Sequence, residues 1–78
     1  MVTYDEDADV LYVRLTEDPV AKTETLDDLR LIDYSSDGAV IGIEFIDASP
    51  GIDLRDVPFR HKVEQLIGDS GLAIKILA

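Results

Sequence analysis

The chain has 78 residues, a formal net charge of −10 and no cysteine, which allows one small domain over residues 1–78 and excludes a disulfide scaffold, an iron–sulfur cluster and a thiolate zinc site. An apolar fraction of 46% is typical of a globular chain, and a pI near 4.1 argues against direct nucleic-acid binding. No apolar run approaches the roughly 20 residues of a membrane span, and no basic and apolar leader follows Met1, so we expect a cytoplasmic protein without a signal peptide.

The first half of the chain is predicted to begin with three strands. A short strand over Val2–Tyr4 leads through an acidic turn into Val10–Leu15, which is rich in β-branched and aromatic residues. Pro19 ends this second strand, since proline cannot donate to a central ladder. The third strand, Val20–Leu26, carries charged side chains in its middle, which is typical of an edge strand.

Two more strands complete the predicted sheet. Leu29–Tyr34 is followed by an Asp-Gly turn at Gly38 and then by Ala39–Ile46, the most apolar strand, with Ile41, Ile43 and Phe45 on one face. Gly42 interrupts the other face, which indicates a bulge or a close approach by another element. Consecutive hairpins predict an antiparallel β-meander of about five strands within residues 1–49.

Residues 50–78 are predicted to form one helix and a short final strand. Asp56 is the expected N-cap of a helix over about residues 57–67, and Gly68 is expected to end it. One apolar stripe along this helix is expected to pack on the sheet, formed by Phe59, Val63, Leu66 and Ile67. The fold class is therefore α+β. The final strand, Leu72–Leu77, offers an edge for pairing with a second copy, and a homodimer is expected because so small a core supplies only about 3–5 kcal/mol.

The net charge lies entirely in the first two-thirds of the chain. Residues 1–49 hold thirteen acidic and three basic residues, whereas residues 50–78 hold four of each. Such asymmetry indicates an acidic surface for a basic protein partner, although turn chemistry and adaptation to a saline cytoplasm would also produce it. The candidate interaction residues are acids of the predicted turns: Asp5, Asp7, Asp9, Asp27, Asp28 and Asp37.

No motif in the sequence predicts catalysis, a metal site or a cofactor. The Asp5-x-Asp7-x-Asp9 run resembles the start of a calcium loop, but Val10 and Thr16 stand where the glycine and glutamate are required. His61 is the only histidine and is interpreted as an exposed helix residue. We therefore expect no enzymatic activity.

The strand and turn segments together resemble a small prokaryotic family, the domain of unknown function 2283. The resemblance covers about residues 2–49 and rests on Tyr4-Asp5, Ala8-Asp9-Val10-Leu11-Tyr12, Asp37-Gly38 and Ile41-Gly42-Ile43-Glu44. It implies a small, mostly antiparallel intracellular protein and brings no catalytic residues. Members are similar to products often encoded beside a small ribonuclease-like toxin candidate, which implies an antitoxin-like role.

From sequence, the favoured function is a non-enzymatic acidic interaction module that neutralises or scaffolds a basic protein. Electrostatic attraction would steer such an acidic inhibitor onto a basic toxin. The alternatives are a small-ligand or metal-responsive module and a structural subunit.

Overall fold

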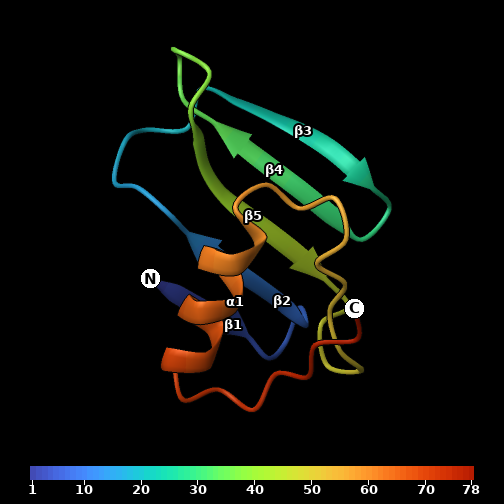
Figure 1. Cartoon of the computed structure of the whole chain (residues 1–78). Coiled ribbons are helices and arrows are strands. Elements are labelled where there is room, and N and C mark those ends of the chain that lie inside the picture. The colour runs from blue at the N-terminus through green and yellow to red at the C-terminus, as the bar shows by residue number, and fades with distance from the viewer.

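Five antiparallel strands and one helix make up the computed structural model, which describes residues 1–78 (Figure 1). The elements in chain order are β1 (Val2–Asp5), β2 (Val10–Arg14), β3 (Lys22–Asp27), β4 (Arg30–Tyr34), β5 (Val40–Ile46) and α1 (Arg60–Asp69). All four strand pairings are antiparallel. The predicted α+β class is confirmed.

The order of the strands differs from that of a meander. The sheet runs β1-β2-β5-β4-β3, so three of the four hairpins of the predicted meander are present, and β2 pairs with β5 instead of β3. Burial explains the order, because β5 is the strand with most buried residues and β3 is exposed over almost its whole length. The seven-residue link 15–21 crosses three strand spacings, about 14 Å, which an extended chain of this length spans easily.

The hydrophobic core lies between one face of the sheet and a cover formed by α1 and the loop before it (Figure 1). Alternate residues of the central strands supply the sheet side of the core, as the period-two pattern predicts. The sheet contributes Leu11, Val13, Ile32, Ile43 and Phe45 to this core, and the cover contributes Ala48, Ile52, Leu54, Val57, Val63 and Ile67. Ile41 is also fully buried but lies outside this cluster, next to the irregularity in the β4–β5 register.

The helix begins and ends later than the sequence predicts. Residues 57–59 are not helical, Asp56 is not the N-cap, and Phe59 takes that position with a left-handed φ of 56° and no side-chain cap. Ile52, Leu54 and Val57 are buried in the core, which holds the chain off the helical path until Phe59. Phe59 is 65% exposed and so does not belong to the apolar stripe, whereas Val63 and Ile67 are buried as expected.

The end of the chain is a cover segment and not a free strand. Only one parallel bridge forms, between Ile52 and Ile76, and the predicted strand Leu72–Leu77 is otherwise absent. The N–H of Leu77 donates to the Ile52 carbonyl at 2.8 Å, and the Leu54 N–H donates to the carbonyl of Ala78 at 3.1 Å. These bonds occupy one edge of the segment. The helix itself continues through Gly68, which was expected to end it, and stops before Ser70.

Gly42 allows a tyrosine to lie flat across the uncovered face of the sheet. An added Cβ there would stand 2.5 Å from Tyr12 Oη and 2.7 Å from the backbone oxygen of Val13. The Tyr12 hydroxyl donates to Asp33 Oδ2 at 2.8 Å, and the Thr23 hydroxyl donates to the other oxygen of the same carboxylate at 2.5 Å. The close approach predicted from sequence is thus confirmed, and it ties together side chains of β2, β4 and β3.

We predict that Gly42→Ala destabilises the protein by about 1–3 kcal/mol, because the new methyl group overlaps the Tyr12 ring and a backbone oxygen that cannot move away. Urea unfolding followed by circular dichroism measures this change. The matched control is Gly68→Ala, where nothing lies within 4 Å of the added Cβ. In the helix, that substitution should stabilise by about 0.5–1 kcal/mol. Equal effects of the two substitutions would contradict the packing role of Gly42.

Candidate functional site

The structure gathers five of the six predicted interaction acids at one end of the sheet. Asp5 pairs with Val10, and Val10 pairs with Ile46, so the β1–β2 turn lies beside the end of β5. The Ile46 N–H donates to the Leu29 carbonyl at 2.8 Å, which places the β3–β4 turn at the same end. We call this region, with Asp47 after β5, the acidic end. Asp37 lies in the β4–β5 turn at the opposite end.

Most of the predicted acids serve the turns in which they lie. Asp5 Oδ1 accepts the backbone N–H of Asp7 at 3.0 Å, and Asp37 accepts the hydroxyl of Ser35. This hydroxyl holds the pKa of Asp37 below its ordinary value. Asp27 binds Arg30 and accepts the N–H of Leu29. These side chains are hydrogen-bonded inside the chain, which supports the turn-chemistry interpretation for them.

Asp9 acts as a clasp between the first hairpin and the segment after β5. Its two carboxylate oxygens accept the Tyr4 hydroxyl at 2.6 Å and the Ser49 hydroxyl at 2.8 Å, and the Ser49 N–H adds a third bond at 2.9 Å. The hydrogen bond to Asp9 raises the pKa of Tyr4 to about 12, and the same bond lowers the pKa of Asp9. Asp5 and Asp9 therefore bind different internal donors, and the structure contains no group of three or more potential metal ligands.

Four acidic side chains at this end make no hydrogen bond or ion pair and are exposed. They are Glu6, Asp7, Asp28 and Asp47. Asp7 and Asp28 were predicted from sequence as interaction residues, whereas Glu6 and Asp47 were not singled out. Position in the turn separates these unpaired acids from Asp5 and Asp27. An Asp at the first position of a turn accepts backbone N–H groups of that turn, and the residues after it do not.

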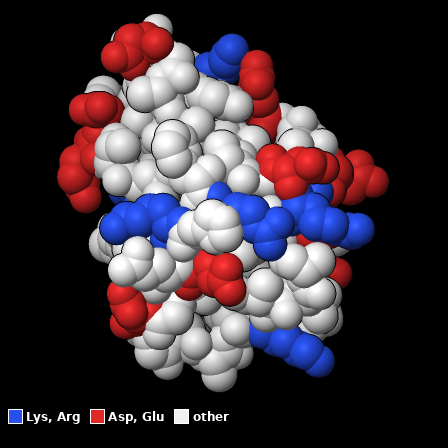
Figure 2. Space-filling model, in the orientation of Figure 1, with Lys and Arg blue, Asp and Glu red and all other residues white.

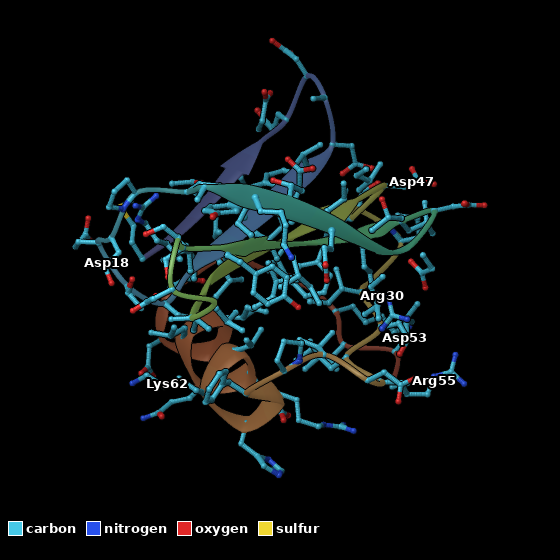
Figure 3. The ribbon with its side chains drawn as sticks, turned by 90° about the horizontal axis from the view of Figure 1, so that it is seen from above. Asp18, Arg30, Asp47, Asp53, Arg55 and Lys62 are labelled. Atoms are coloured by element: carbon cyan, nitrogen blue, oxygen red, sulfur yellow. The ribbon has the colours of Figure 1, made fainter.

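Arg30 fastens the cover to the sheet beside the acidic end (Figure 3). Its side chain is nearly buried, and its Nη2 donates to Asp27 Oδ2 at 2.7 Å. Its Nη1 donates to the backbone carbonyls of Asp53, at 3.0 Å, and of Arg55. Arg55 in turn binds the Asp53 carboxylate, and this hydrogen bond lowers the pKa of Asp53 to about 2. The guanidinium thus donates four hydrogen bonds to groups of the same chain.

An apolar hollow of about 250 Å³ opens next to Arg30. Phe45 and Ile52 are almost completely buried, whereas Leu29 and Leu77 are 48% and 58% exposed. The lining residues are Asp27, Leu29, Arg30, Phe45, Ile46, Gly51, Ile52, Asp53 and Leu77. We call this the Leu29–Leu77 hollow. This hollow was not predicted from the sequence, although a leucine directly after two turn aspartates indicates an exposed aliphatic side chain.

The remaining sequence candidates lie apart from this hollow. His61 is exposed on α1, as predicted, and makes no hydrogen bond. Four of the seven Lys and Arg residues lie within residues 55–75, and Figure 2 shows basic side chains in a band across the face that carries α1, with acidic groups next to this band and toward the margins. The single helix has 10 residues and falls short of the length and apolarity of a membrane span.

Comparison with known proteins gives one match. The family model described as "Protein of unknown function (DUF2283)" matches residues 1–49, which contain all five strands and the Asp9–Ser49 clasp. The searches of curated proteins and of solved structures each found no match. The family resemblance stated from the sequence motifs is confirmed.

We predict that Arg30→Met destabilises the fold by about 3 kcal/mol, because two carbonyls and a carboxylate lose a nearly buried partner. The matched control is Arg55→Met, since Arg55 is 70% exposed and its ion pair with Asp53 is worth about 1 kcal/mol or less. Urea unfolding midpoints of both variants provide the comparison. A loss for Arg55→Met as large as that for Arg30→Met would contradict the fastening role of Arg30.

We predict a loss of stability between about pH 10 and pH 12 that depends on two tyrosines. The fold raises the pKa of Tyr4 to about 12, and burial with the Asp33 hydrogen bond raises that of Tyr12 to about 12. Because both pKa values are higher in the folded state, each tyrosine contributes its full stabilisation of the fold below its ordinary pKa of 10.0. This contribution is lost as the pH rises through 12.

Absorbance titration of the phenolate in the native protein and in urea measures these pKa values. Tyr4→Phe and Tyr12→Phe should each remove one high-pH step. Titration of both residues near pH 10 in the native protein would show that the two hydrogen bonds do not form in solution.

Proposed function

The chain belongs to the DUF2283 family of proteins of unknown function, and from this premise we propose that it is a non-catalytic interaction module that binds a basic protein at its acidic end. One observation carries the proposal: the unpaired carboxylates of Asp28 and Asp47 are next in the chain to lining residues of an apolar hollow with two exposed leucines. An apolar centre with a charged rim is the usual arrangement of a protein-binding surface. The hollow and the carboxylates near it fit a partner that presents an aliphatic side chain flanked by lysine or arginine.

The electrostatics of the acidic end favour this kind of partner. Asp27 neutralises Arg30, and Arg55 neutralises Asp53, so the ion pairs at the hollow leave no excess positive charge. Asp28 and Asp47 then add two negative charges beside the hollow, and Glu6 and Asp7 add two more at the same end of the sheet. Such a field raises the rate of association with a basic protein and repels an acidic one. A cytoplasmic antitoxin-like role, in which the partner is a basic ribonuclease-like toxin, is consistent with this field.

The shifts in pKa support a binding role over acid–base catalysis. The carboxyl pKa values with a resolved shift, those of Asp9, Asp27, Asp37 and Asp53, are all lowered by hydrogen bonds within the chain. A general acid near neutral pH requires the opposite shift. The hollow is also small for a ligand site, since 250 Å³ lies below the roughly 300–1,000 Å³ of typical ligand pockets. Both observations favour a macromolecular partner.

We predict that Asp28→Lys/Asp47→Lys weakens binding to a basic peptide with a leucine core, Lys-Lys-Leu-Leu-Lys-Lys, by about tenfold or more. The measurement is a titration of isotope-labelled protein by nuclear magnetic resonance, in which amide shifts should concentrate at Leu29, Ile46 and Leu77. The control variant is Glu64→Lys/Asp69→Lys on α1, which changes the net charge by the same amount and should bind as the unaltered protein does.

The same pair of variants tests the natural partner. Affinity capture from the host in moderate salt should recover a basic protein with the unaltered chain and with the α1 control, and not with Asp28→Lys/Asp47→Lys. The captured protein should lose its activity when bound. If both double variants bind the peptide and the captured protein equally, the acidic end is not the binding surface.

A further inference from the structure

Phe59 combines an unfavourable backbone conformation with an exposed ring. Its φ of 56° and ψ of 38° are left-handed, a region that bulky residues seldom occupy. Its side chain packs little against the rest of the chain, since 65% of the residue remains exposed. Asparagine or glycine would occupy this N-cap position at lower cost. Residues in unfavourable backbone conformations are concentrated at functional sites. At Phe59 this conformation holds an aromatic ring exposed to solvent.

A groove lies beside this ring, at the end of the sheet opposite the acidic end. It has a volume of about 170 Å³ and lies between the end of β2, the start of β5 and the start of α1. Its lining residues are Leu15, Thr16, Val40, Phe59 and Lys62. Three of the five are apolar, so water occupies a space that an apolar side chain would fill favourably.

One positive charge lines the groove, and one unpaired negative charge lies in the chain segment that follows it. Lys62 lines it from the helix and makes no ion pair or hydrogen bond. Asp18 follows two residues after Thr16, and its carboxylate is also unpaired and exposed. Figure 3 shows Asp18 and Lys62 on the same side of the molecule, with Asp18 in the layer of the sheet and Lys62 in the layer of α1.

We propose that this surface binds the same surface of a second copy of the chain around a two-fold axis. The Phe59 ring of each copy would enter the groove at Leu15 and Val40 of the other, and Lys62 would pair with Asp18 of the partner subunit. In a two-fold interface every contact occurs twice, so a surface with both charges around an apolar centre is complementary to itself. A partner of one charge sign would be repelled by one side of the groove.

This interface is independent of the proposed binding of a basic protein. It uses the end of the sheet with the link after β2 and the start of α1, and it leaves the Leu29–Leu77 hollow of each copy open. It also differs from pairing through the C-terminal segment, one edge of which is bonded to Ile52 and Leu54.

The test is the oligomeric state, measured by sedimentation equilibrium at about 0.15 M salt, where overall repulsion between the acidic chains is screened. The unaltered chain should be dimeric, and Phe59→Ser should raise the dissociation constant about tenfold or more. Phe59→Gly should weaken the dimer in the same way. Its monomer should melt at a temperature no lower than that of the monomer of the unaltered chain, because glycine removes the strain at this position. This second variant separates loss of the interface from loss of the fold.

Charge exchange gives the sharpest outcome. Asp18→Lys and Lys62→Glu should each weaken the dimer about tenfold, and the double variant should restore it, since each new lysine then faces a new glutamate. The controls are Leu72→Ser, Asp28→Lys and Lys75→Glu, which alter exposed residues elsewhere and should leave the dimer intact. A monomer at all concentrations up to about 1 mM would overturn the proposal. So would a double variant that dimerises no better than the single ones.

Discussion

The fold depends on the attachment of the segment after residue 50 to the sheet, and Arg30 makes that attachment. The chain has no cysteine, so no disulfide holds the cover in place. The Arg30 guanidinium reaches from β4 to two carbonyls of the cover, and Asp27 supplies the balancing charge. Once this loop is fixed, Ile52, Leu54 and Val57 fill the core, and the end of the chain pairs with Ile52. One nearly buried cation thus organises the apolar layer.

The acidic composition has two physical origins that the sequence does not separate. Asp5, Asp9, Asp27 and Asp37 stabilise turns or bind cations and hydroxyls within the chain. Glu6, Asp7, Asp28 and Asp47 do not, although two of them are direct neighbours of the first group. A count of charges treats all eight alike. The net charge of −10 therefore overstates the charge available at the acidic end, where four carboxylates are free to meet a partner.

Local features were predictable from the sequence, and features that join distant residues were not. Alternation in Val10–Leu15 and in Ala39–Ile46, together with the Asp-Gly turn, was sufficient to predict strands and hairpins, because these depend on neighbouring residues. The place of β5 between β2 and β4 follows from competition among strands for the buried centre, which no single segment reveals. The same limit applies to the site. Arg30 donates to carbonyls 23 and 25 positions further along the chain, and the Leu29–Leu77 hollow is lined by four separate segments.

The strand order also constrains how the chain folds. The β1–β2 hairpin can form early, but its neighbour β5 follows only after the link, β3 and β4, so Leu11 must find Phe45 across a long intervening segment. Closing such a loop costs entropy before any contact repays it, and this cost slows folding. Until β5 arrives, one edge of β2 has no partner within the chain. The pairing of β2 with β5 joins the β1–β2 hairpin to the three strands β3, β4 and β5, and this pairing completes the native strand order.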